Sequence, residues 1–242
     1  EDYYELIGVR KIALNKKLSK VIDLSGRLRF QKRWAQTPRI PETSVLGHML
    51  TVAIFSYFYS LNVKACDKRL QNNFFTALFH DLPEALTRDI ISPVKYSVDE
   101  LSDIIAEYEV AKIEDDILPN IPESIQEEFS YILGLYNGIK EEFANKVKID
   151  GKITEVEDIS KYNIDKYEAI DGKALKQCDK LSAFVEASLS ISHGIKSKEL
   201  ISGKKEIFKG LKEINGVDFK KIAQEIDNEF GSNGQVQTTL DF

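Results

Sequence analysis

The chain has 242 residues, of which 43% are hydrophobic and 30% are charged, an ordinary composition for a soluble globular protein. Its 33 Lys and Arg against 39 Asp and Glu give a net charge of −6 without a long basic block, which argues against a nucleic-acid partner but allows a small phosphorylated substrate. The two cysteines show no disulfide or metal-ligand pattern and no signal peptide is visible, so a cytoplasmic location is expected.

Helical periodicity dominates the sequence. It predicts helices over residues 10–30, 45–61, 70–80, 98–118, 123–143, 173–192 and 217–229. Ser44 is a suitable N-cap for the second helix, and Pro83 helps to end the third. The second helix is the only candidate membrane span, but it is about one turn short and contains His48, so we expect a buried core helix and no membrane.

One strand signal interrupts the helices. Residues 147–153 surround Asp150-Gly151, a pair that favours a tight hairpin turn. The hairpin falls in a polar connector, residues 144–172, that has the character of an insertion. The predicted fold class is therefore all-α, a bundle of six or seven helices with a small β-hairpin insertion.

The expected domain organisation is simple. A single helical domain occupies residues 1–230, with its core in about residues 10–195. Residues 231–242 are rich in Gly, Ser, Asn and Gln and are expected to form a flexible tail.

Three histidines are available for chemistry. His48 lies in the apolar helix, where a lone histidine is more often a hydrogen-bonded core residue than a ligand. That interpretation is weakened by His80, which ends a second apolar run and is followed directly by Asp81. His193 lies near a helix end and is better explained as a helix-terminal cation.

Glu84 and Asp179 could each belong to a metal site or have a purely structural role. Glu84 follows Asp81 by three residues, so it could transfer protons beside a metal, or it could be a helix N-terminal charge after Pro83. Asp179 shares a helical stripe with small and apolar residues and is paired, at the helix edge, or bound to a metal. The residues alone leave these alternatives open.

Three blocks of sequence together carry a resemblance. They are Arg33-Trp34 with His48 fourteen residues after the Trp, the run HDLPEALTRDIISPVKY over residues 80–96, and residues 176–183, KQCDKLSA. The order His, His-Asp, Asp resembles the HD-domain metal phosphohydrolases, and within them the YfbR-like 5′-deoxynucleotidases. The blocks span about two-thirds of the chain, residues 33–190. The stretch between Asp81 and Asp179 is longer than in that group, which leaves the nucleotide preference open.

The resemblance implies a set of site residues. The metal ligands would be His48, His80, Asp81 and Asp179, the acid/base residue Glu84, and the substrate contacts Arg33, Trp34, Asp89 and the turn through Ser92. Two imidazole nitrogens and two carboxylate oxygens suit a divalent transition ion, namely Mn, Fe, Co, Ni or Zn, with Mg possible.

The implied reaction is hydrolysis of a deoxyribonucleoside 5′-monophosphate to a deoxynucleoside and phosphate. The partner would be a small-molecule nucleotide, and dimers are common in the resembled group, so a homodimer is expected. Two alternatives stay open: another HD phosphohydrolase acting on a nucleoside triphosphate, cyclic nucleotide or alarmone, and a catalytically inactive nucleotide-binding regulator.

Overall fold

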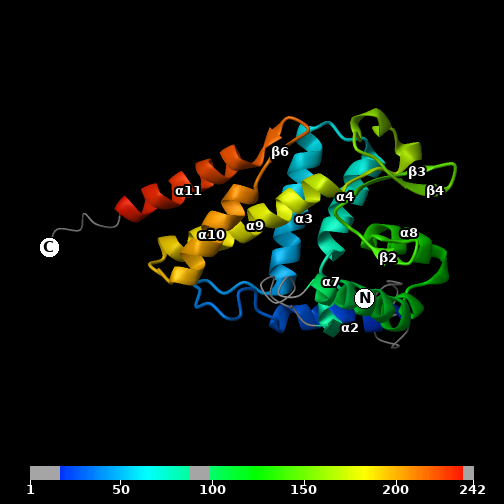
Figure 1. Ribbon diagram of the computed structural model, residues 1–242, viewed down its shortest axis with the longest axis horizontal. Helices are drawn as coiled ribbons and strands as arrows, with labels where there is room; N and C mark the ends of the chain where they lie inside the picture. Colours follow the sequence, from blue (N-terminus) through cyan, green and yellow to red (C-terminus); the bar gives the residue numbers. More distant parts are fainter. Residues whose placement is uncertain (1–16, 88–98, 237–242) are drawn as a thin grey trace, which may run out of the picture. The chain divides into compact units, whose positions relative to one another are not determined.

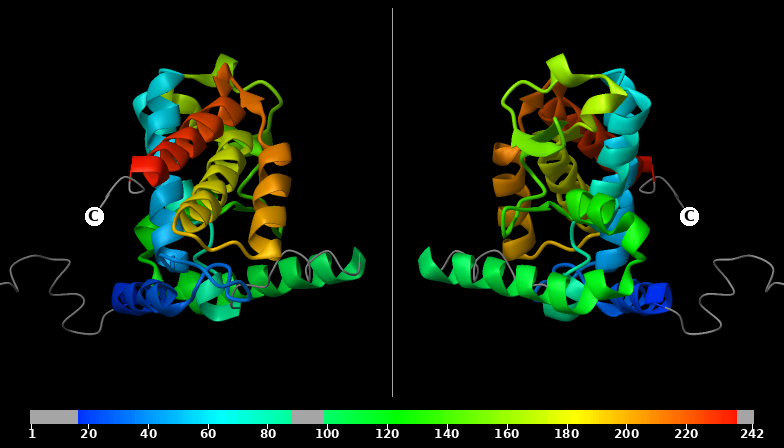
Figure 2. Two further views of the ribbon diagram at one scale, coloured as in Figure 1. Left: turned by 90° about the vertical axis from the view of Figure 1, so that its left-hand side faces the viewer. Right: turned by 90° about the vertical axis from the view of Figure 1, so that its right-hand side faces the viewer.

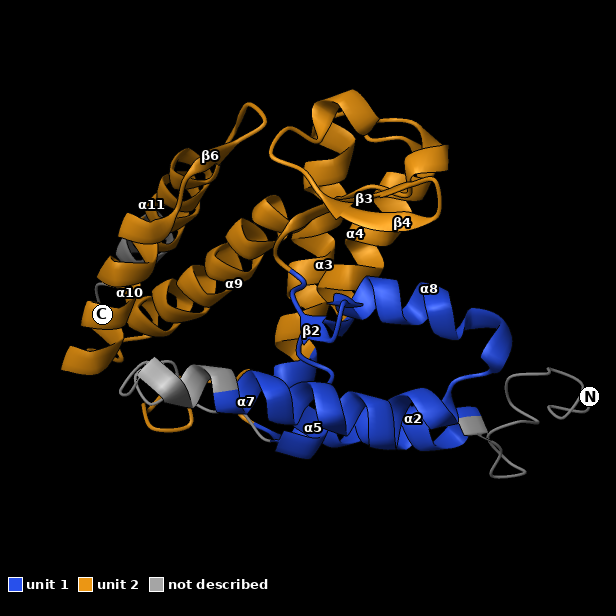
Figure 3. Ribbon diagram, turned by 45° about the vertical axis from the view of Figure 1, so that its right-hand side comes forward, with its two compact units in different colours: residues 1–31, 44–46, 79–142 blue, residues 32–43, 47–78, 143–242 orange. Residues whose placement is uncertain are grey.

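The computed structural model describes residues 17–87 and 99–236, which are mostly helical with three small antiparallel sheets (Figure 1). The chain divides into two compact units (Figure 3). The first comprises residues 1–31, 44–46 and 79–142, and the second comprises residues 32–43, 47–78 and 143–242. The single domain expected over residues 1–230 stays a prediction.

The first unit is built from short helices. Its elements are α2 (Lys17–Arg27), η2 (Leu28–Phe30), α5 (Glu84–Thr87), α7 (Asp99–Lys112), the π turn η3 (Ile113–Ile117), η4 (Leu118–Asn120) and α8 (Glu123–Leu133). Val21, Leu24 and Leu28 recur at helical spacing and are all buried. The predicted helix over residues 98–118 is thus α7 continued by the π turn, and the described part of the 10–30 prediction is α2 and η2.

The prediction of one helix over residues 123–143 was wrong in its second half. The helix α8 ends at Gly134, which has a φ of 80°, and a Cβ there would lie 2.7 Å from backbone atoms of Glu141. The strands β1 (Leu135–Tyr136) and β2 (Ile139–Lys140) follow, joined through Asn137-Gly138, both with positive φ. The turn chemistry of these residues overrides the apolar periodicity.

The second unit contains the long helices. They are α3 (Val45–Asn62), which belongs to this unit from Gly47 on, α4 (Asp67–Phe79), α9 (Gly172–Ser192), α10 (Lys198–Gly210) and α11 (Phe219–Val236). The helix α9 packs against both α10 and α11 (Figure 2). The sequence did not predict α10, whose N-cap is the Ser197 hydroxyl accepting a hydrogen bond from Leu200 N. The helix α11 reaches Val236, six residues into the predicted flexible tail.

The predicted hairpin of residues 147–153 is confirmed and is part of a larger sheet. The strands β3 (Asn145–Ile149) and β4 (Lys152–Glu155) pair antiparallel around Asp150-Gly151, both with positive φ. A strand that was not predicted, β5 (Ile170–Asp171), pairs with the other edge of β3. The connector also contains the short helices η5 (Ser160–Tyr162) and η6 (Asp165–Tyr167).

A second hairpin precedes α11. The strands β6 (Glu213–Ile214) and β7 (Val217–Asp218) pair around Asn215-Gly216. The predicted helix over residues 217–229 therefore begins two residues later, at Phe219.

The helix α3 is the one helix in the described ranges that is long and apolar enough to cross a membrane, judged by length and composition alone. Within the molecule 44% of that window is buried. Its buried positions include the polar residues His48, Ser56 and Ser60. A core helix of a soluble protein passes the same test, and the expected absence of a membrane stays a prediction.

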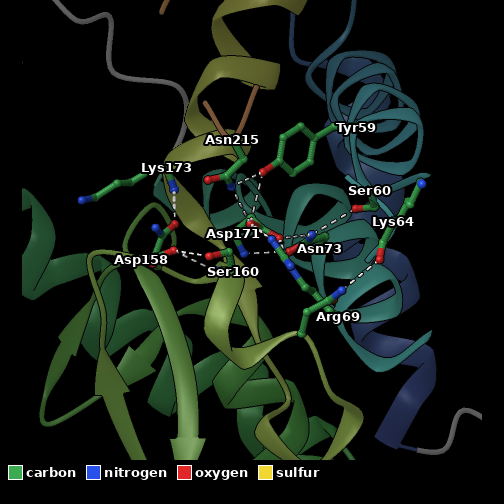
Figure 4. A network of polar contacts seen from close by, with 12 residues as sticks. Tyr59, Ser60, Lys64, Arg69, Asn73, Asp158, Ser160, Asp171, Lys173 and Asn215 are labelled. Atoms are coloured by element: carbon green, nitrogen blue, oxygen red, sulfur yellow. Dashed lines mark hydrogen bonds and ion pairs between the residues drawn. The ribbon is translucent and has the colours of Figure 1, made fainter. Parts of the chain in front are cut away.

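The buried carboxylate of Asp171 joins several elements of the second unit (Figure 4). Arg69 of α4 donates two hydrogen bonds to it, at 2.6 and 2.7 Å, and Asn73 donates a third at 2.7 Å. Tyr59 of α3 donates from its hydroxyl at 3.2 Å, and Asn215 of the β6–β7 turn bonds to that hydroxyl at 2.7 Å. Because Asp171 directly precedes α9, this network fixes where α9 begins relative to α3 and α4.

We predict that Asp171→Ala lowers the free energy of unfolding by about 3–5 kcal/mol, because it leaves the Arg69 charge buried without its carboxylate. Urea denaturation followed by circular dichroism measures this change. The matched control is Glu206→Ala, which removes the exposed Lys209–Glu206 pair and should cost no more than about 1 kcal/mol. Equal losses in the two variants would contradict a structural role for the network.

Candidate metal centre

The helix α9 presents three polar side chains on one stripe. Asp179, Ser182 and Glu186 recur at intervals of three and four residues, which places them on the same face of the helix. Leu175, Cys178, Leu181 and Phe184 of the same helix are buried and hold it in the core.

His48 of α3 lies between two of these carboxylates and is fully buried. Its Nε2 is 2.9 Å from Asp179 Oδ1, and its Nδ1 is 2.9 Å from Glu186 Oε1. The Ser182 hydroxyl lies 3.1 Å from the same Nδ1. The prediction left open whether Asp179 is paired, and in the second unit it is paired with His48.

The hydrogen-bonding capacity of His48 suits a metal ion beside one of its nitrogens. A neutral imidazole has one N–H and can donate to only one of two carboxylates. If Nδ1 donates to Glu186, the lone pair of Nε2 faces Asp179 and needs a proton or a cation beside it. Metal–ligand bonds of about 2.0–2.2 Å place neighbouring ligand atoms on the order of 3 Å apart, and the Nε2–Oδ1 separation agrees with this. His48 and Asp179 therefore fit a divalent ion.

The pKa shifts of His48 and Glu186 agree with their hydrogen bond. Burial and the charge of Arg33 act to lower the pKa of His48, but its hydrogen bonds to Asp179 and Glu186 outweigh them and raise that pKa. Burial acts to raise the pKa of Glu186, yet its hydrogen bond to His48 and the charges of Arg33 and Arg39 hold that pKa below its usual value. Glu186 is thus an ionised carboxylate behind the imidazole.

The segment over residues 32–43 supplies further contacts. Trp34 Nε1 donates to Glu186 Oε2 at 2.9 Å, and Arg39 Nη1 donates to the same oxygen at 3.2 Å. Arg33 donates its backbone N–H to Thr43 O at 2.9 Å and acts on His48 and Glu186 through its charge. Trp34 and Arg33, both predicted as substrate contacts, therefore share the second unit with His48 and Asp179.

The His-Asp pair lies in the first unit, at a turn. His80 and Glu84 are buried, and His80 Nε2 is 3.2 Å from Asp81 Oδ2. Glu84 begins α5 and donates its backbone N–H to Asp81 O at 3.0 Å, while its carbonyl accepts from Gln31 Nε2. Glu84 is thus both a helix-terminal residue and a buried carboxylate beside the motif.

Lys140 of β2 adds a cation to this part of the first unit. It bonds to Glu142 at 2.9 Å and lies 3.8 Å from Glu109. Burial would lower the pKa of Lys140, but Glu142, Glu109 and Asp81 outweigh it and raise that pKa.

Three other residues considered in the sequence, and two that were not, complete the description of the site. Asp89 and Ser92 lie outside the described residues. His193 is the C-cap of α9 and is exposed, and its Nδ1 lies 2.7 Å from Leu189 O, which agrees with the predicted helix-terminal position. Glu186 and Arg39 were not predicted, although Glu186 follows Asp179 by seven residues on the same helical stripe, a spacing that could have found it.

Comparisons with known proteins identify the family. The HD-domain family matches residues 25–229, so the chain belongs to the HD-domain family. A search of curated proteins found no match. The predicted all-α HD fold with a small β insertion is confirmed.

This chain is similar to several solved structures. An HD-domain phosphohydrolase from Listeria innocua has a TM-score of 0.63 at 20% identity, covering 92% of this chain and 93% of that one. The HD phosphohydrolase DatZ of cyanophage S-2L, bound to dA and one catalytic Zn²⁺ ion, has a TM-score of 0.49 at 15% identity and covers 88% and 96%. A conserved hypothetical protein from Pyrococcus furiosus has a TM-score of 0.48 at 20% identity and covers 88% and 98%.

We predict that a bound divalent ion stabilises the protein through His48 and Asp179. At a hundredfold excess over Kd the gain is about 2.7 kcal/mol, which for a chain of this size raises Tm by about 5–10 °C. Thermal denaturation with and without Zn²⁺, Mn²⁺ or Co²⁺ measures the shift. Asp179→Asn should abolish most of it, whereas His193→Ala should keep it. A shift that survives Asp179→Asn, or is lost in His193→Ala, would place the ion elsewhere.

Proposed function

We propose that this protein is a metal-dependent phosphomonoesterase that converts a deoxyribonucleoside 5′-monophosphate and water to a deoxynucleoside and phosphate. The observation that carries the proposal is the contact pattern of the buried His48. Its Nε2 contacts the carboxylate of Asp179, and its Nδ1 contacts the carboxylate of Glu186. A buried imidazole held this way in an HD-domain protein is suited to a metal ligand. The nucleotidase specificity rests on the resemblance to the YfbR-like enzymes.

The proposed ligands are His48, His80, Asp81 and Asp179, two nitrogen and two oxygen donors. This set favours Mn, Fe, Co, Ni or Zn over calcium, with Mg possible. When bound, such an ion lowers the pKa of a coordinated water and offsets phosphate charge. Membership of the HD-domain family and the fit of His48 and Asp179 to a cation support this assignment.

The acid/base role falls to Glu84. Its side chain is buried, and its backbone is bonded to the neighbouring Asp81, so the carboxylate is held close to the His-Asp motif in the first unit. It would protonate the departing 5′ oxygen or orient the attacking water. A carboxyl group can fill either role, because it donates a hydrogen bond when protonated and accepts one when ionised.

The substrate contacts divide by chemistry. Arg33 would bind the phosphate through its forked guanidinium, whose contact geometry a lysine does not reproduce. Trp34 donates its indole N–H to Glu186, so the apolar face of its ring is left to pack against the sugar. Asp89 is proposed to accept a hydrogen bond from the 3′-hydroxyl and Ser92 to line the pocket. The homodimer and the cytoplasmic location belong to the same proposal.

The reaction is tested on metal-free protein restored singly with Mn²⁺, Co²⁺, Mg²⁺ or Zn²⁺. Phosphate release is measured from paired ribo- and deoxyribonucleoside monophosphates, with di-, tri- and cyclic nucleotides alongside, and Asp81→Ala is the blank. We expect metal-dependent release confined to deoxyribonucleoside monophosphates.

Other results of this assay would redirect the proposal. Release from both sugars would keep the phosphatase and reject sugar selection by Trp34 and Asp89. Turnover of only tri- or cyclic nucleotides would favour another HD phosphohydrolase. No release with any metal, with nucleotide still bound, would favour an inactive regulator. Activity that survives in Asp81→Ala would contradict the proposed ligand set.

We predict that Glu84→Gln slows turnover by about 10²–10⁴-fold without loss of bound metal, because it removes only the proton transfer. The matched control is Glu123→Gln, which changes an exposed glutamate that also begins a helix. Metal content and the rate of phosphate release are measured on both variants. Equal small effects would make Glu84 a helix-terminal charge, and loss of metal would make it a ligand.

A further inference from the structure

The carboxylate of Glu186 is the meeting point of three segments of the second unit. Its Oε1 lies on Nδ1 of His48 in α3, and its Oε2 accepts from Trp34 Nε1 and from Arg39 Nη1 in the segment over residues 32–43. The side chain is 7% exposed, so these contacts are made away from bulk water. Each carboxylate oxygen thus serves a different part of the proposed site.

We propose that Glu186 is a positioning residue that couples the metal ligand His48 to the substrate wall Trp34. This inference rests on the proposed function, because it takes His48 as a ligand and Trp34 as a substrate contact. One rigid carboxylate would set the orientation of both rings, so that a change at one is transmitted to the other.

The effect on His48 follows from its tautomer. An N–H on Nδ1 that donates to Glu186 leaves the lone pair on Nε2, the nitrogen that faces Asp179. A carboxylate behind a ligating imidazole fixes the ring and raises its basicity. Arg39 lies 3.2 Å from Glu186 Oε2 and holds that carboxylate in place from the side away from the imidazole contact.

The effect on Trp34 follows from its unusual backbone. Trp34 has a φ of 58°, a conformation that a bulky residue adopts only where its surroundings support it. Its indole is held at two edges. The N–H bonds to Glu186, and the six-membered ring lies so close to Gly203 of α10 that a Cβ there would be 3.0 and 3.1 Å from ring atoms.

Arg39 ties the same segment together. It is buried, and besides Glu186 it donates to Thr43 Oγ1 at 2.9 Å and to Pro41 O at 3.2 Å. The loop that carries Trp34 is therefore anchored to Glu186 at two points. Loss of the Glu186 carboxylate would therefore allow both Trp34 and His48 to change orientation.

Trp34 is the only tryptophan of the chain, so its fluorescence reports this coupling directly. Zn²⁺ is a suitable probe because its filled d shell carries no redox chemistry. The experiment uses the full chain and three variants: Glu186→Gln, Gly203→Ala, and the exposed control Glu206→Gln. Zn²⁺ affinity is measured by competition with a chromogenic chelator, and Trp34 emission is followed during the same titration.

In the wild type and in Glu206→Gln, Zn²⁺ should bind and change the emission of Trp34. In Glu186→Gln the affinity should fall about 10–100-fold and the emission should no longer respond to Zn²⁺ even at saturation. Gly203→Ala should shift the emission of the metal-free protein but leave Zn²⁺ affinity within about threefold, because Ala reaches the indole and leaves His48 untouched.

A purely structural Glu186 gives a different result. Glu186→Gln would then lower Tm while the folded protein keeps its Zn²⁺ affinity and its fluorescence response, and the coupling would be overturned. A wild type that binds no Zn²⁺ overturns the proposed function, and the coupling with it. If the wild type binds Zn²⁺ and Glu186→Gln shows the same Zn²⁺ affinity and the same Trp34 response, only the coupling is overturned.

Discussion

The buried carboxylate of Asp171 is the constraint on which the second unit depends. It accepts a bidentate contact from Arg69 and further hydrogen bonds from α3, α4 and the β6–β7 turn. Asp171 is also the residue immediately before α9. A helix fixed at its first residue presents its later side chains at set heights and angles. Asp179 and Glu186, two and four turns along α9, are thereby held opposite His48.

This arrangement gives the two ring nitrogens of His48 different surroundings. Asp179, on the Nε2 side of His48, is 27% exposed and so is partly accessible to water. Glu186 lies at the buried side, with Arg39 to balance its charge. The two sides of His48 thus differ in burial: the partly exposed Asp179 is suited to binding an ion, and the buried Glu186 is suited to orienting the ring.

Much of this could be predicted from the sequence, and the failures have identifiable physical causes. The helical bundle followed from the apolar periodicity, and the HD fold followed from the resemblance carried by the three sequence blocks. The resemblance also implied that His48 and Asp179 lie together, whereas the residues alone left the partner of Asp179 open. The hairpin after α8 was missed because Gly134 and Asn137-Gly138 lie within an apolar pattern of helical period. Glu186 shares the helical stripe of Asp179, which could have indicated it, but a single sequence does not show that it contacts His48, Trp34 and Arg39.

Anomalous diffraction at the zinc edge from crystals of the Zn²⁺-loaded protein tests this arrangement most directly. We expect one ion bonded to His48 Nε2 and to an oxygen of Asp179, with Glu186 bonded to Nδ1 of the same ring. An ion bonded through Nδ1, an ion at another place in the chain, or a His48–Asp179 contact left closed beside a fully loaded site would contradict it.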